Sequence, residues 1–139
     1  MNRAEFCEMM AQARQSHSCS LYAIQKKMNL IFRDVKRIET GEHNFNLIKA
    51  IDFLAAFNSA VELSNDNESF VINNYPSFVE RLINIRTSNN HTLRSLADAA
   101  GCSYAAIANT ERQRSVLSID VFLKLMDVLG YTIKITSRL

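Results

Sequence analysis

The chain has 139 residues, of which 47% are hydrophobic and 22% are charged, and its formal net charge is +2. This length suits one ordinary domain or two very small ones, and the near-average composition argues against disorder and against a strongly basic tail. Three cysteines without paired spacing argue against a disulfide framework and a CxxC zinc clamp. The sequence contains neither an apolar run of roughly 18 residues nor a signal-peptide pattern, so we expect a cytoplasmic protein with no membrane partner.

A single proline and three glycines predict a mainly helical fold, because these residues interrupt helices. The apolar spacing predicts four short helices in the first half, near residues 3–15, 21–28, 32–40 and 47–58. It predicts four more in the second half, near residues 77–88, 93–100, 104–112 and 119–129. After the fourth helix of each half, the segments SAVELS and YTIKITS alternate apolar and polar residues, which predicts a short strand at each place.

Side chains that cap helix N-termini precede several of these helices. They are Ser20, Asn46, Thr92 and Ser118. At the start of the second half, Pro76 blocks continuation of a helix from upstream, and Ser77 with Glu80 has the spacing of a capping box. We therefore expect a new helix to begin at residue 77.

Shifting the sequence by 72 residues aligns its two halves without a gap. The identical pairs are Phe6 with Phe78, Glu8 with Glu80, Arg14 with Arg86, Ser16 with Ser88, Leu21 with Leu93 and Glu39 with Glu111. Apolar positions keep the same offset, so the sequence indicates an internal duplication. We expect repeats at residues 1–64 and 76–139 and a linker at 65–75, in which Phe70, Val71 and Ile72 dock on a hydrophobic surface.

Within each half, a short helix, a tight turn and a second short helix resemble the Xre-type, phage-repressor-like helix-turn-helix family. The matching stretches are SLYAIQKKMNLIFRDVKRIETGEHNFNL and TLRSLADAAGCSYAAIANTE. The family's turn corresponds to Asn29 and Gly101, and its glutamate near the end of the recognition helix corresponds to Glu39 and Glu111, which we expect to bond within their own halves. The resemblance implies a mainly all-α fold of two tandem repressor-like units, each with four short helices followed by a short β-strand.

The resemblance also implies a sequence-specific DNA-binding transcriptional regulator with recognition helices near 32–40 and 104–112. The candidates for contacts with DNA bases are Arg33, Lys36, Arg37, Ser103, Tyr104 and Asn109. The candidates for contacts with phosphates are Lys26, Lys27, Arg94, Arg112 and Arg114. Arginine can bond guanine through two donors and asparagine can pair with adenine, while Ala105 and Ala108 would let the second helix approach thymine methyl groups. Two alternatives stay open: a solvated, ion-paired face on 32–40, and a Tyr104 that packs in the core.

Double-stranded DNA is therefore the expected partner. Members of this family usually bind as two-fold dimers with recognition helices about one DNA turn, roughly 34 Å, apart. Here the dimer could be a homodimer, or an intramolecular pseudo-dimer in which SAVELS pairs with YTIKITS; alternatively, only one repeat reads DNA and the other serves as a dimer contact. A further alternative is a protein-interaction module with weak or no DNA binding, such as an antitoxin-like partner of a toxin. Enzyme, cofactor and metal motifs are absent from the sequence, so we expect no enzymatic activity, no cofactor and no metal site.

Overall fold

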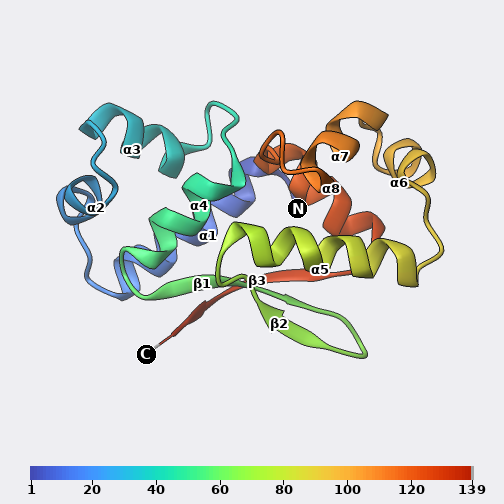
Figure 1. Cartoon of the computed structure of the whole chain (residues 1–139). Coiled ribbons are helices and arrows are strands. Elements are labelled where there is room, and N and C mark those ends of the chain that lie inside the picture. The colour runs from blue at the N-terminus through green and yellow to red at the C-terminus, as the bar shows by residue number, and fades with distance from the viewer. Residues whose placement is uncertain (139) are drawn as a thin grey trace.

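The computed structural model describes residues 1–138, which form eight α-helices and one three-stranded sheet (Figure 1). The first half contains α1 (Arg3–Ser16), α2 (Leu21–Met28), α3 (Phe32–Thr40), α4 (Leu47–Ala55) and β1 (Ser59–Ser64). The second half contains β2 (Ser69–Val71), α5 (Tyr75–Ser88), α6 (Leu93–Ala100), α7 (Tyr104–Glu111), α8 (Ile119–Val128) and β3 (Thr132–Ser137). The mainly helical fold is confirmed. Within the described part of the chain, every helix is too short or too polar to cross a membrane.

Corresponding helices of the two halves start 72 residues apart, at Arg3 and Tyr75, Leu21 and Leu93, Phe32 and Tyr104, and Leu47 and Ile119. The predicted caps are confirmed, because each side chain accepts a hydrogen bond from a backbone N–H in the first turn. These caps are Ser20, Asn46, Thr92 and Ser118. The 72-residue offset in the sequence therefore has a counterpart in the positions of the helices and their caps.

The predicted cap of the fifth helix is wrong, and the helix begins two residues before the expected residue 77. The helix α5 begins at Tyr75, and its cap is Asn74, whose side chain accepts from the Ser77 N–H at 2.9 Å. Pro76 lies in the first turn, where a missing N–H costs nothing because no carbonyl is in reach. The expected capping box of Ser77 with Glu80 does not form.

The expected linker also contains a strand. Residues Ser69–Val71 form β2, which pairs antiparallel with β1 and extends the sheet to the order β2-β1-β3. Phe70 packs edge-on against Tyr131, with ring centroids 5.8 Å apart, and the neighbouring Ile72 is buried. The expected docking of this segment is therefore confirmed, but it docks as a strand.

The backbones of the two halves pair with each other at two places, both antiparallel, which we call the two crossings. The strand β1 pairs with β3, as expected for SAVELS and YTIKITS, and the ladder includes the pair Glu62 with Lys134. In the second crossing, the Leu47 N–H donates to the Leu117 carbonyl at 2.8 Å, and the Ile119 N–H donates to the Phe45 carbonyl at 2.7 Å.

The second crossing is centred on Asn46 opposite Ser118. Asn46 and Ser118 are 72 residues apart, and so are Glu62 and Lys134, which face each other in the first crossing. In each crossing, therefore, residues at corresponding positions of the two halves face each other. This arrangement is that of a local two-fold axis running through both crossings.

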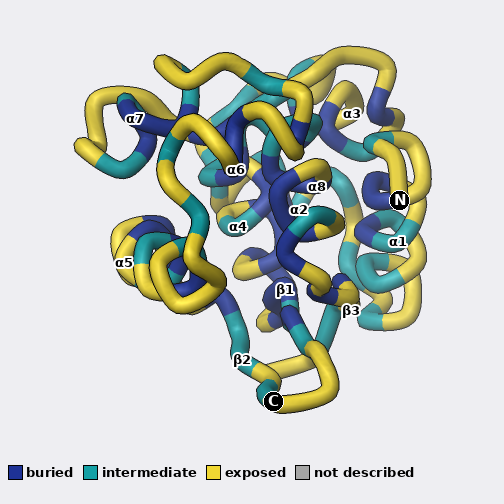
Figure 2. Tube along the Cα trace, turned by 90° about the vertical axis from the view of Figure 1, so that its right-hand side faces the viewer, coloured by how far each residue is buried: buried dark blue, intermediate teal, exposed yellow. Residues whose placement is uncertain are grey.

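A single hydrophobic core draws buried residues from both halves and lies between the helices and the sheet (Figure 2). The Phe122 ring contacts both Phe6 and Phe78, with centroids 6.4 and 5.5 Å away and the rings in edge-to-face geometry. Phe6 and Phe78 occupy corresponding positions, whereas the position that corresponds to Phe122 holds Ala50, which is also fully buried. One aromatic ring therefore fills the centre of the molecule from one side only.

Candidate nucleic-acid interface

The helices α3 and α7 lie at the end of the molecule that is opposite the sheet, as both Figure 1 and Figure 2 show. Each is entered from the preceding helix through a tight turn with a left-handed residue at its start. That residue is Asn29, with φ 54°, before α3 and Gly101, with φ 67°, before α7. Both residue types tolerate positive φ, so the two predicted turn positions are confirmed.

The helix α3 is fixed to the core by a narrow apolar stripe and one ion pair. Val35 and Ile38 are buried, while the Arg14 guanidinium donates to both carboxylate oxygens of Glu39 at 2.6 and 2.9 Å. The same guanidinium donates to the Cys19 carbonyl at 2.8 Å, so it ties α1, the following loop and α3 together. The hydrogen bonds with Glu39 raise the pKa of Arg14, which keeps the pair charged.

The second half repeats this arrangement. Arg86 donates to both oxygens of Glu111 at 2.6 and 2.9 Å and to the His91 carbonyl at 2.9 Å, and Ile107 is buried beneath α7. The prediction that Glu39 and Glu111 bond within their own halves is confirmed. Both glutamates therefore position a helix and are not available to a ligand.

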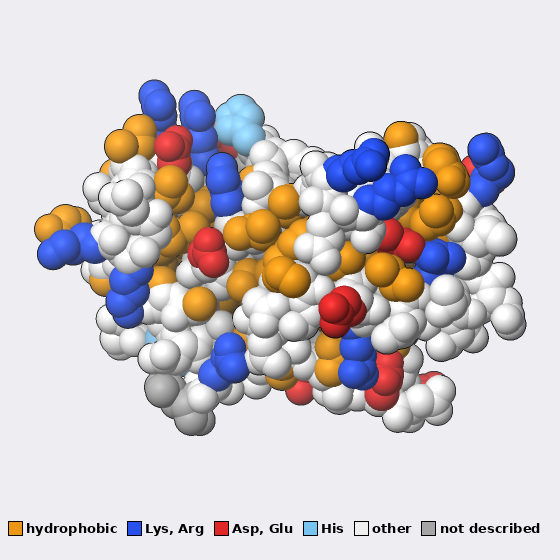
Figure 3. All heavy atoms as spheres, in the orientation of Figure 1, with side chains coloured by type: hydrophobic (Ala, Val, Ile, Leu, Met, Phe, Trp, Pro, Cys, Tyr) orange, Lys and Arg blue, Asp and Glu red, His pale blue; other side chains and the backbone are white. Residues whose placement is uncertain are grey.

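The outer side of α3 carries Arg33, Lys36 and Arg37, all of them exposed. Arg33 approaches Asp34 only at 3.9 Å, and its side chain is 68% exposed. Among residues 1–138, Lys36 and Arg37 take part in no ion pair, so this face is not neutralised by its own acids. Lys and Arg side chains gather along the edge of the molecule formed by α3 and by α7 with its following loop (Figure 3).

A hollow of about 160 Å³ lies beside the C-terminal part of α3. Arg37, His43 and Lys49 line it together with Asp34. Lys49 was not among the predicted phosphate contacts. The signal that could have identified it is its place in the first turn of α4 after the cap Asn46, since helix N-termini attract anions.

The start of α3 is apolar. Ile31 occupies the cap position without a side-chain hydrogen bond, and it is 54% exposed, while Phe32 is 52% exposed. Tyr22, in α2, is also exposed. These three side chains place apolar surface next to the cationic face of α3.

The outer side of α7 is less charged. Ser103 caps the helix by accepting from the Ala106 N–H at 3.1 Å, and Asn109 is half-buried. Tyr104 is exposed and lies beneath the Arg94 guanidinium, 5.3 Å from the ring centroid, so the alternative that it packs in the core is wrong. The expectation that Ala108 lies on the outer side of α7 is also wrong, because this side chain is only 3% exposed.

The predicted phosphate contacts differ in their surroundings. Arg112 and Arg114 are exposed in the loop that follows α7, and the Arg114 N–H donates to the Asn109 carbonyl at 2.8 Å. Between them, Gln113 adopts the left-handed conformation that Gly41 adopts after α3. The Lys27 ammonium instead donates to the Ala56 carbonyl at 2.6 Å, so it serves the end of α4.

Lys26 is exposed and lies over the Tyr22 ring, 5.5 Å from its centroid. The structure therefore brings Arg33, Lys36 and Arg37 together around α3, with Lys26 in the preceding helix. It brings Ser103, Tyr104, Asn109, Arg94, Arg112 and Arg114 together around α7.

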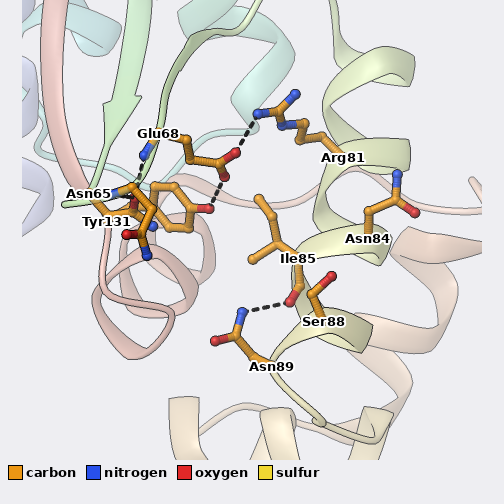
Figure 4. Close-up of a pocket in the computed structure, with 9 residues that line it drawn as sticks. Asn65, Glu68, Arg81, Asn84, Ile85, Ser88, Asn89 and Tyr131 are labelled. Carbon is orange, nitrogen blue, oxygen red and sulfur yellow. Dashed lines mark hydrogen bonds and ion pairs between the residues drawn. The ribbon is translucent and has the colours of Figure 1, made fainter.

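A second, polar hollow of about 440 Å³ lies next to the sheet, between the β1–β2 turn and α5 (Figure 4). The Tyr131 hydroxyl donates to Glu68, which forms an ion pair of 2.8 Å with Arg81. Burial and the Glu68 carboxylate raise the pKa of Tyr131 to about 12. Since these groups satisfy one another, they join the strand turn to α5. In the described residues, no group of three His, Cys, Asp or Glu side chains could hold a metal ion.

In the comparison with known families, a helix-turn-helix model aligns with residues 82–135. This segment runs from the middle of α5 into β3 and contains α6, the turn at Gly101 and α7. The match identifies an Xre-like helix-turn-helix in the second half, which suggests a DNA-binding regulator. Neither a curated protein nor a solved structure matches the chain.

Proposed function

We propose that this protein is a sequence-specific DNA-binding transcriptional regulator built from two tandem helix-turn-helix units, residues 1–64 and 76–139. The observation that carries the proposal is the matched presentation of α3 and α7. Each helix is held by a bidentate Arg–Glu pair, and both face away from the sheet with exposed cations around them. A duplex could therefore meet both helices without any rearrangement of the core.

The second unit supplies base contacts from a nearly neutral helix. Ser103, Tyr104 and Asn109 would face the base edges. Asn109 suits adenine, because its amide N–H can donate to N7 while its carbonyl oxygen accepts from the N6 amino group. Arg94, Arg112 and Arg114 would bind phosphates on either side of α7 and so fix its register. The helix-turn-helix match covers this unit.

The first unit supplies base contacts from a cationic helix. Arg33 and Arg37 can each bond guanine through O6 and N7, while Lys36 can meet either a base or a phosphate. Lys26 would contact the backbone from the preceding helix, and Lys49 with His43 would contact it from the hollow beside Arg37. The unpaired state of Lys36 and Arg37 leaves them available to DNA without first breaking an internal ion pair.

The test is selection of bound duplexes from a random library with the intact chain, followed by a salt series on the selected site. A protein that neutralises Z phosphates loses affinity with a log–log slope near −0.9Z, so contacts with about five phosphates predict a slope near −4 to −5. Lys134→Ala is the matched control, since Lys134 is exposed on the sheet at the opposite end. It should leave affinity and slope unchanged, whereas Arg37→Ala should weaken binding. A flat salt response, or a library that yields no preferred sequence, would exclude the proposal.

The alternative function is a protein-interaction module, for example an antitoxin-like partner of a toxin. The exposed apolar side chains Tyr22, Ile31 and Phe32 favour it, because exposed apolar patches commonly mark protein contacts. Under this alternative, the unmodified chain would select no DNA sequence from the library. It would capture a protein partner, and Phe32→Ser would abolish that capture. Recovery of a salt-dependent DNA site from the library would instead support the regulator.

A further inference from the structure

We infer that one chain, without a second copy, recognises one duplex site composed of two inverted but unlike arms at a fixed spacing. This inference rests on the proposed function and specifies the kind of DNA that the interface fits. It is carried by the local two-fold axis, by the difference between the faces of α3 and α7, and by the continuous core that joins the halves.

The local axis determines the relative orientation of the arms. Both crossings of the chain are antiparallel, and each contains one pair of facing residues that are 72 positions apart: Glu62 with Lys134, and Asn46 with Ser118. A two-fold axis through these pairs relates α3 to α7, so the two helices meet the duplex in opposite directions. A two-fold arrangement of recognition helices matches an inverted repeat in DNA. A direct repeat would need a translation, which this fold does not contain.

The two helices differ in what they can read. Exposed Arg33 and Arg37 on α3 favour guanine, whereas Ala105 and Asn109 on α7 favour thymine methyl groups and adenine. The site should therefore have a G·C-rich arm under α3 and an A·T-rich arm under α7. Such a site is inverted in geometry but is not a palindrome in sequence.

The joined core fixes the distance between the arms. Arg3, in α1, forms an ion pair of 2.6 Å with Asp120 in α8, and it also donates to the Gly41 carbonyl at 2.9 Å, directly after α3. Together with the sheet and the shared core, this contact connects the base of α3 to the second half. The halves therefore lack the freedom of two domains on a flexible linker, and the spacing cannot adjust to DNA.

The centre of the core favours pairing within one chain. Phe122 packs on both Phe6 and Phe78, and its counterpart Ala50 is fully buried. The local axis puts residue 50 opposite residue 122, where the small alanine side chain would make room for the ring. Two first halves from different chains would bring alanine to both sides and leave a void. Two second halves would bring phenylalanine to both sides and overfill the same space. The unlike pair thus makes the two halves complementary to each other rather than to themselves.

The experiment combines library selection with native mass spectrometry of the intact chain on the selected duplex. We expect one protein per duplex and a motif with one G·C-rich and one A·T-rich arm. Inserting one base pair between the arms turns them by roughly 35° and moves them about 3.4 Å apart, so affinity should fall at least tenfold. Reversing one arm to make a direct repeat should have the same effect.

Two variants assign the arms. Arg37→Ala should relax the preference in the G·C-rich arm only, and Asn109→Ala should relax it in the A·T-rich arm only, with far-UV circular dichroism confirming that both variants fold. Four results would overturn this inference while leaving the DNA-binding function intact. They are a palindromic motif, two chains per duplex, unchanged affinity after insertion of the base pair, and two variants that both lose sequence preference in the same arm. Absence of any selected DNA would overturn both.

Discussion

Phe122 offers the most direct test of the local two-fold axis. Its side chain is fully buried between Phe6 and Phe78, so truncation to alanine removes a whole ring from the centre of the core. Buried phenylalanine-to-alanine changes cost about 3–5 kcal/mol. Since a small protein has a stability of about 5–15 kcal/mol, Phe122→Ala should remove a large part of it.

The axis places Ala50 on the other side of the same space. Ala50→Phe alone should overpack the centre and cost about 1–3 kcal/mol. In the double variant, the new ring at residue 50 would occupy the space that Phe122→Ala vacates and would pack on Phe6 and Phe78 from the opposite side. The double variant should therefore be more stable than the sum of the two single changes predicts, by about 1–3 kcal/mol.

The assay is urea unfolding followed by far-UV circular dichroism for the unmodified chain, both single variants and the double variant. Ile24→Ala provides the control, because Ile24 is buried in α2, which packs on α3 and α4 rather than on the α8 helix that carries Phe122. Its combination with Phe122→Ala should be additive within about 0.5 kcal/mol. Additive effects of the changes at residues 50 and 122 would mean that the two positions do not share one space. That result would refute the two-fold reasoning.

Three further predictions concern single sites. Gly41→Ala should lower the free energy of unfolding, measured in urea, by about 2 kcal/mol or more, and Gly101→Ala should lower it by about 1 kcal/mol. Both glycines have positive φ, but only at Gly41 would a new Cβ lie 3.1 Å from the Cys7 sulfur. Equal losses in the two variants would contradict this reasoning. Arg86→Ala should cost about 3–5 kcal/mol by leaving the Glu111 carboxylate, 10% exposed, without its partner, and a loss below about 1 kcal/mol would show that the pair does not hold α7. Burial raises the pKa of the Cys7 thiol from 9.0 to about 11, so the unfolded thiol ionises first and the free energy of unfolding falls as pH rises through this interval. The fall between about pH 9 and 11 should be smaller in Cys7→Ser.

Local sequence signals were sufficient for most of the helices. Caps such as Ser20 and Ser118 act within one turn of the chain, and the helix starts that they predict lie within a few residues of those observed. The predicted cap of α5 was wrong because Asn74, Ser77 and other polar residues compete for one helix end, and only the backbone path decides which of them caps it.

Features that depend on distant partners could not be predicted in this way. The strand β2 has three residues, too few for a periodic pattern, and exists because β1 offers it an edge. The burial of Ala108 and the bond from Lys27 to Ala56 depend on how helices pack, which spacing along one helix does not specify. The ion pairs that hold α3 and α7 were predicted only in part. Glu39 and Glu111 were identified as structural, but Arg14 and Arg86 were not identified as their partners.

The pairing of β1 with β3 has a consequence for the protein's synthesis. Ser59 pairs with Ser137, so β1 can pair with β3 only after residues 132–137 have left the ribosome. Until then, one edge of β1 stays open, and an open strand edge is a template for association with other chains. Termination of synthesis before Thr132 would leave β1 in that state permanently, so a chain that lacks β3 should aggregate rather than survive as a working half-molecule.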